Sequence, residues 1–191
     1  MAPAASSIFC TTLLMTPILR TARLTLRPIA LADAAALFAY RRNADVMNYW
    51  DWPPQKNLRD VQRIIRAHAK AIGNGTVEWW AVALTDDGPA IGECDLSEID
   101  HHHKHAEVGF LFRLDLWGKG YAHEAMQAVI AHAFGALGLA RLWARSHSGN
   151  ARSKRLLERL GFEHEGTLRA HVLRDGVRRD CEIYGLLARA P

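Results

Sequence analysis

Residues 106–125 decide the fold, and they read AEVGFLFRLDLWGKGYAHEA. The apolar run at 106–112 has the character of a strand, and the turn at 117–122 leads from it into a helical pattern. Gly118 and Gly120 carry no Cβ, so the backbone of this turn can bend tightly and approach an anion closely. The first turn of a helix also presents unpaired amides and the positive end of its dipole. The sequence therefore predicts an anion site where this strand meets this helix.

Two nucleotide-binding motifs do not fit this turn. The Walker A spacing G-x-x-x-x-G-K-[ST] is absent, and the dinucleotide pattern G-x-G-x-x-G lacks its third glycine. A strand-to-helix turn that needs glycine only for its shape fits the same residues equally well. The glycine pattern alone leaves these two interpretations open.

Periodicity along the chain predicts one α+β domain, an α/β sandwich around a single sheet, in the order β-α-α-β-β-β-α-β-α-β-β. Strands are expected at 23–29, 79–85, 90–99, 106–112, 141–147, about 162–173 and 178–187. Helices are expected from Asp33 to about Arg42, after Asn57 to Ile72, at about 121–137 and between Asn150 and Gly161. The strands at 106–112 and 141–147 with the helix between them make a β-α-β crossover. Open sheets bind ligands at the carboxyl ends of such strands.

Three segments resemble the GNAT superfamily of N-acetyltransferases, and in particular the branch of ribosomal-protein N-terminal alanine and serine acetyltransferases. They are 106–110, 117–125 and 150–162, and the resemblance covers about residues 16–187. It implies a mixed, mostly antiparallel twisted sheet with helices on both faces and a parallel pair splayed around acetyl-CoA. The family's turn has the form Q/R-x-x-G-x-G/A. Trp117 stands at the Q/R position, which removes one polar side chain but leaves the backbone cradle.

The resemblance assigns the cofactor residues. The backbone of Phe110, Leu111 and Phe112 is expected to pair with the pantetheine arm, and the amides of residues 118–122 to hold the pyrophosphate. The turn comprises Trp117, Gly118, Lys119, Gly120, Tyr121 and Ala122. Asn150 and Ser153 match the family's N-x-x-S element, although Asn is also among the best helix N-caps. Ser153 is a candidate to protonate the departing thiolate of coenzyme A.

Acetyl transfer to an amine needs a proton acceptor, because an alkyl amine with a pKa of about 10.4 is protonated at neutral pH. The candidates for this base are Glu107, Glu165, Glu98 and the histidines, and a structural ion pair is the alternative role for Glu107. Tyr184 on the last strand is a further acid candidate, with a place in the core as its alternative.

Aromatic residues after the first helix predict the acceptor pocket. Tyr49, Trp50 and Trp52 flank Asp51, and together they are suited to hold an amine or a peptide N-terminus through cation–π and charge contacts. Packing beneath a loop explains these aromatic residues equally well. The expected acceptor is a primary amine of a small molecule or a protein N-terminus. A longer acyl group such as succinyl, and a non-catalytic acyl-CoA-binding module, remain alternatives.

Four histidines at positions 101, 102, 103 and 105 suggest a metal site. Acyl transfer needs no metal ion, and a polar hairpin loop explains the same residues. We therefore expect no metal.

Composition narrows the remaining function classes. The 191 residues carry a net charge of +4, and the basic residues are scattered rather than clustered, so no nucleic-acid partner is predicted. No run of about 18 apolar residues is present, so no membrane partner is expected. Three cysteines without a disulfide pattern favour a cytoplasmic location. A monomer or homodimer is expected, with residues 1–14 as an extension before a domain at 15–191.

Overall fold

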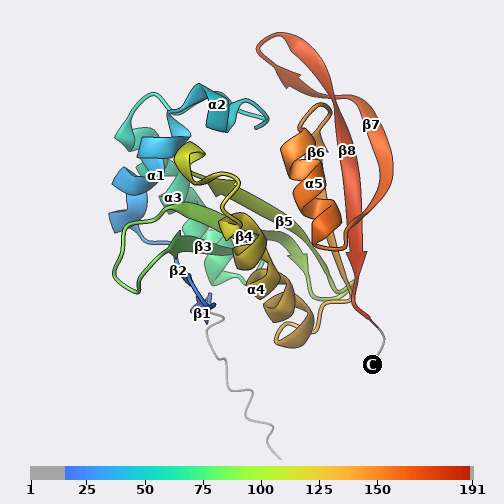
Figure 1. The fold of residues 1–191 in the computed structure, drawn as a ribbon, viewed down its shortest axis with the longest axis horizontal. Helices are drawn as coiled ribbons and strands as arrows, with labels where there is room; N and C mark the ends of the chain where they lie inside the picture. The colour runs from blue at the N-terminus through green and yellow to red at the C-terminus, as the bar shows by residue number, and fades with distance from the viewer. Residues whose placement is uncertain (1–15, 190–191) are drawn as a thin grey trace, which may run out of the picture.

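An eight-stranded sheet lies at the centre of the protein, in a computed structural model that describes residues 16–189 (Figure 1). The strand order is β1-β2-β3-β4-β5-β6-β8-β7, and every neighbouring pair is antiparallel except β5 and β6. The strands are β1 (Leu19–Arg20), β2 (Thr25–Pro28), β3 (Glu78–Ala83), β4 (Gly92–Asp100), β5 (His105–Phe112), β6 (Arg141–His147), β7 (Glu163–Arg174) and β8 (Val177–Leu187). The α-helices are α1 (Ala34–Arg41), α2 (Ala44–Met47), α3 (Leu58–Gly73), α4 (Tyr121–Gly135) and α5 (Ala151–Arg159), and the 3-10 turns are η1 (Leu31–Asp33) and η2 (Leu114–Leu116).

Helices cover both faces of the sheet, as expected from the sequence. One core cluster joins α4 and α5 to the sheet through residues such as Met126, Leu142 and Leu157. The other joins α1 and α3 to the opposite face through residues such as Leu37 and Val61. Figure 1 shows α4 and α5 on the near side of the sheet and α1, α2 and α3 grouped away from them. The alternation of side chains along the strands produces these two separate cores.

The sheet confirms the predicted β-α-β crossover and adds a detail that matters for ligand binding. Strands β5 and β6 run parallel, but they pair only from His105 to Glu107 on β5 and from Arg141 to Trp143 on β6. Beyond Glu107 the two strands separate, while β5 stays paired with β4 up to Phe112. One edge of β5 is therefore open toward the carboxyl end of the strand. The splayed parallel pair expected from the family resemblance is present.

Most helix ends follow the sequence signals. The side chains of Asn57 and Asn150 accept hydrogen bonds from the amides of Asp60 and Ser153, and so cap α3 and α5. Helix α4 ends at Gly135 rather than at about residue 137. The short elements β1 and α2 were not predicted, because two to four residues give too little periodicity to detect.

The expected cap at Asp33 is wrong. The Asp33 carboxylate instead accepts two hydrogen bonds from Arg27, at 2.8 and 2.7 Å, and one from the amide of Ala30. The paired guanidinium takes the place of the helix amides, because a charged bidentate partner binds a carboxylate more strongly than neutral N–H groups do.

Two expectations about the chain ends have a limited outcome here. The predicted extension at residues 1–14 lies outside the described residues, so it stays a prediction, as does the single domain at 15–191. Among residues 16–189, no helix combines the length and the apolar character needed to cross a membrane.

Candidate active site

The glycine turn forms a backbone cradle at the open end of the β5–β6 pair. Gly118 and Gly120 have positive φ values of 78° and 82°, and Gly120 is the residue from which α4 begins. The amides of residues 118–122 donate no hydrogen bond to any acceptor within the described chain. Residues 118–120 are exposed. Five unpaired, accessible N–H groups at the positive end of a 15-residue helix make a site that fits a pyrophosphate.

Trp117 is positioned by its neighbours rather than directed into solvent. Its Nε1 donates to the carbonyl oxygen of Phe112 at 2.9 Å, which ties the turn to the end of β5. The guanidinium of Arg152, in the first turn of α5, lies 4.9 Å from the centre of the Trp117 ring. The tryptophan at the family's Q/R position therefore brings a guanidinium beside the turn through a cation–π contact.

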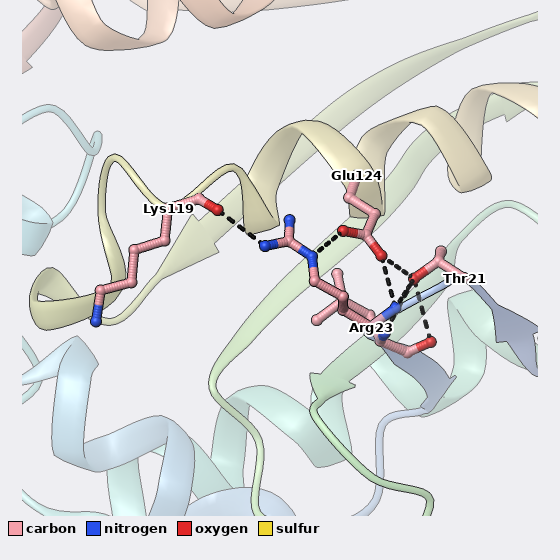
Figure 2. Close-up of polar contacts among 5 residues, drawn as sticks. Thr21, Arg23, Lys119 and Glu124 are labelled. Carbon is pink, nitrogen blue, oxygen red and sulfur yellow. Dashed lines mark hydrogen bonds and ion pairs between the residues drawn. The ribbon is translucent and has the colours of Figure 1, made fainter.

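A second guanidinium braces the turn from the β1–β2 connection, as Figure 2 shows. Arg23 donates through Nη1 to the carbonyl oxygen of Lys119 at 3.2 Å and through Nε to Glu124 at 2.6 Å. The backbone N–H of Arg23 and the hydroxyl of Thr21 bind the same Glu124 carboxylate. Glu124 lies in the first turn of α4, where its charge would oppose an incoming phosphate. Pairing with Arg23 offsets that charge and fixes the start of the helix.

The open edge of β5 is where the sequence placed the pantetheine arm. Leu111 and Phe112 are buried and Phe110 is partly buried, so these three residues offer their backbone rather than their side chains. Buried polar atoms also face the gap from β6. Among the described residues, Ser146 Oγ and His147 Nδ1 have no hydrogen-bond partner. Unpartnered polar groups are rare in a protein interior, and a bound ligand commonly accounts for them.

Asn150, Ser153 and Tyr184 lie on the α5 side of the sheet. Asn150 Oδ1 accepts from the Ser153 amide at 3.1 Å, and the Ser153 hydroxyl makes no hydrogen bond to other residues in the range 16–189. Tyr184 is 3% exposed, and burial raises the pKa of its hydroxyl. The serine is thus free to act as a donor, whereas the tyrosine is packed in the core beneath α5.

On the opposite face of the sheet, Glu107 belongs to a polar network. Arg145 Nε donates to Glu107 at 2.9 Å, and the same guanidinium lies 3.5 Å from Asp51. His147 Nε2 donates to Asp51 at 2.7 Å, and this hydrogen bond is the main reason that the pKa of Asp51 is lowered. Because Nε2 carries the proton, a neutral His147 presents a lone pair at the buried Nδ1. The network ties the loop after α2 to the end of β6.

Asp95 on β4 is the main residue of this face that the sequence did not single out. It lies opposite Gly109 in the β4–β5 ladder, and a Cβ at Gly109 would collide with its carboxylate. Burial, followed by the charges of Glu93 and Glu107, raises the pKa of Asp95 to about 7. Burial also raises the pKa of Glu107, against the opposing effect of Arg145. The alternation along β4 places Asp95 and Ser97 on one face and was the available sequence signal.

The structure does not bring the other predicted carboxylates into this group. Glu165 lies on β7 and forms an ion pair with Arg141, which stands at the first residue of β6, where β5 and β6 are still paired. The hydrogen bond from Arg141 lowers the pKa of Glu165. Glu98 is exposed at a bulge in β4. Neither carboxylate lies at the open end of the parallel pair.

The aromatic loop reaches toward the same open end. Trp50 and Trp52 are tilted against each other with ring centres 6.1 Å apart, and Trp50 packs on the core beneath α1 and α3. Tyr49 and Trp52 are 37% and 48% exposed. A Cβ on Gly149, just before α5, would lie 4.0 Å from the Tyr49 ring. Trp50 therefore has a packing role, while Tyr49 and Trp52 are free to contact a ligand.

Known proteins share this arrangement. The family model described as an acetyltransferase (GNAT) domain matches residues 23–163. The uncharacterized N-acetyltransferase YoaA of Bacillus subtilis is 31% identical over 91% of this chain and 98% of its own length. The spermidine N(1)-acetyltransferase of Escherichia coli K12 is 27% identical over 82% of this chain and 81% of its own.

The structure of RimL, a ribosomal L7/L12 alpha-N-protein acetyltransferase in complex with coenzyme A, has the same fold. It superposes with a TM-score of 0.82 over 90% of this chain and 98% of its own, at 18% identity. The family model covers well over half of the 191 residues, and the match includes the β5 strand, the glycine turn and α5. On this evidence, the chain belongs to the GNAT acetyltransferase family.

Proposed function

We propose that the protein transfers an acetyl group from acetyl-CoA directly to a primary amine that enters from the α1–α3 face of the sheet. The observation that carries this proposal is the separation of two chemistries by the splayed β5–β6 pair. Unpaired amides and guanidinium groups lie on one side, and ionisable carboxylates lie on the other. The family membership and the coenzyme A in the RimL structure support the choice of donor.

The turn and the open strand are suited to hold the donor. The amides of residues 118–122 would hold the pyrophosphate, with Arg152 close by, and the free edge of β5 at 110–112 would pair with the pantetheine arm. Acetyl-CoA supplies the activated thioester. A backbone N–H of β5 near Phe110 is then placed to donate to the thioester carbonyl oxygen, and the free hydroxyl of Ser153 is placed to protonate the leaving thiolate.

Asp95 is the proposed proton acceptor for the attacking amine. A base works best when its pKa lies near the working pH, and the pKa of about 7 at Asp95 meets that condition. Glu107 is the base proposed from the sequence alone. Because Arg145 is hydrogen-bonded to Glu107, we now give Glu107 a different role, in which its negative charge contributes to the raised pKa of Asp95. This assignment places the base beside Gly109, one residue before Phe110.

The amine acceptor is proposed to be a polyamine, another small amine or a protein N-terminus. Two relatives or structural neighbours support these classes through their names, one for spermidine and one for a ribosomal protein. Exposed Tyr49 and Trp52 are suited to hold a cationic amine through cation–π contacts. Asp51, tied to His147 and Arg145, keeps this loop over the end of β6.

A coupled panel of donors and acceptors tests the proposal. Free thiol is followed while the protein is incubated with acetyl-CoA or succinyl-CoA and with polyamines, amino acids, aminoglycosides or peptides beginning with Ala or Ser. N-acetylated versions of the same peptides are the matched controls. We expect thiol release with acetyl-CoA and one acceptor class, and mass spectrometry should show a gain of one acetyl group. Binding of acetyl-CoA without thiol release on any acceptor would contradict the proposal, and turnover with succinyl-CoA alone would correct the acyl group.

A further inference from the structure

Three metal-ligating side chains meet at the turn between β4 and β5, away from the open end of the sheet. Asp100, His103 and His105 each offer one ligand atom, and the three atoms lie within 4.8 Å of one another. Asp100 Oδ1 accepts from the backbone N–H of His103 at 2.7 Å, and Oδ2 lies 2.8 Å from His103 Nδ1. The carboxylate is thus held in place by the backbone while its second oxygen faces an imidazole.

His105 has ligand capacity that the protein does not use. Its side chain makes no hydrogen bond within the described residues, and its Nδ1 is buried without a partner. Its ring stacks against that of His103 with centres 6.2 Å apart. A buried imidazole nitrogen without a partner is unfavourable, so a ligand that satisfies the ring would stabilise the turn.

We infer that Asp100, His103 and His105 bind one divalent metal ion of the zinc class. Two imidazoles and one carboxylate are the donor set of a three-residue zinc site, which leaves a fourth position for water. His103 is 66% exposed in its side chain, so that position is open to solvent. Ligand atoms around a tetrahedral Zn²⁺ lie roughly 3.4 Å apart, and small side-chain rotations bring these three atoms to that spacing.

The four histidines alone favoured a polar loop over a metal site, and the structure changes this interpretation in two ways. Among the described residues, only two of those histidines belong to the group, and the third ligand is an aspartate just before the run. His101 is directed elsewhere, with Nε2 3.2 Å from the carbonyl oxygen of Gly75.

The site would stabilise the closed end of the β5–β6 pair. The carbonyl oxygen of Lys104, in the same turn, accepts hydrogen bonds from the amides of Ala140 and Arg141 at the start of β6. A metal ion at this turn would therefore hold together β4, β5 and the beginning of β6. The cradle lies at the other end of β5, so metal binding is expected to raise stability without changing acetyl-CoA affinity.

Calorimetry with ZnCl₂ tests the site on the full-length protein after treatment with a chelator and without an affinity tag. We expect one ion to bind, with affinity lowered at least about tenfold in His103→Ala and in His105→Gln. His102→Ala is the matched control, since this exposed histidine of the same turn is outside the group. A Zn²⁺ concentration of about 100 times Kd should raise the melting temperature of the unaltered protein by roughly 5–10 °C.

The exposed His103 keeps the test decisive if His105→Gln fails to fold. Co²⁺ then serves as a second probe, because tetrahedral coordination with imidazole ligands produces visible absorption bands that should vanish in His103→Ala. Absence of binding, or equal binding by His103→Ala and the unaltered protein, would overturn the inference. The loss of Zn²⁺ binding in His102→Ala alone would also overturn it, because the ligands would then be different ones.

Discussion

Replacement of Gly120 by alanine is expected to weaken acetyl-CoA binding by about 5- to 30-fold. Gly120 has φ of 82°, and a residue with a Cβ costs about 1–2 kcal/mol in this left-handed region. The new Cβ would also lie 3.4 Å from Arg23 Nη2, so the side chain that braces the turn hinders any compensating shift. The turn can relieve the strain only by rotating its amides away from the cradle. Binding must then restore the strained form, and 1.4 kcal/mol corresponds to a tenfold change in affinity.

Gly138→Ala is the matched control for this change. Gly138 has φ of 62° beyond the opposite end of α4, and its new Cβ would meet no atom within 4 Å. Both replacements carry a similar backbone cost, so both should lower the melting temperature by about 2–8 °C. Only Gly120→Ala should change the dissociation constant of acetyl-CoA, measured by calorimetry at fixed ionic strength. If both variants bind acetyl-CoA like the unaltered protein, or both lose affinity equally, the assignment of the turn as the phosphate cradle is refuted.

Four further predictions concern the α1–α3 face. Asp95→Asn should lower kcat/KM by about 10²–10⁴-fold and remove the rise in rate near pH 7, so a pH–rate profile with unchanged activity would exclude Asp95 as the base. Glu107→Gln should instead shift that inflection to lower pH, because it removes a negative charge that raises the pKa of Asp95. Asp95 holds its proton more tightly in the folded state, so its contribution to stability is complete below about pH 4 and is lost as the pH rises through about 7; Asp95→Asn should flatten this fall in urea titrations. Arg41→Ala should lower the free energy of unfolding by about 3–5 kcal/mol, because it leaves the buried Glu93 carboxylate without its cation, and a double replacement of both residues by apolar ones should cost less.

The sequence predicted features that depend on neighbouring residues. The glycine turn, the caps at Asn57 and Asn150 and the strand at 141–147 all arise from interactions within a few positions, and the structure has them where expected. The β-α-β crossover follows from the same local patterns. Local pattern also carried the family resemblance, since its three segments are each short and continuous.

Features that depend on distant residues could not be predicted in this way. Arg23 and Glu124 are 101 positions apart, and nothing near either residue indicates that the β1–β2 connection braces the cofactor turn. Asp33 has the sequence signal of a helix cap, yet Arg27 reaches it from the preceding strand. Glu165 fits a family pattern, but the strand register pairs it with Arg141. Sheet topology determines these ion pairs, and the topology follows from the whole chain.

The same distinction explains why the donor is easier to assign than the acceptor. The residues proposed to hold the donor lie in segments of continuous chain around a helix start, so a short motif specifies them. The residues that face the acceptor come from β4, β5, β6 and the loop after α2, and Asp51 alone links that loop to two residues of β6. This loop can change without disturbing the cradle, because no backbone of the cradle passes through it. A fold shared with proteins named for spermidine and for a ribosomal protein is therefore compatible with different acceptors, and the choice between them rests on Tyr49, Trp52 and the carboxylates beside them.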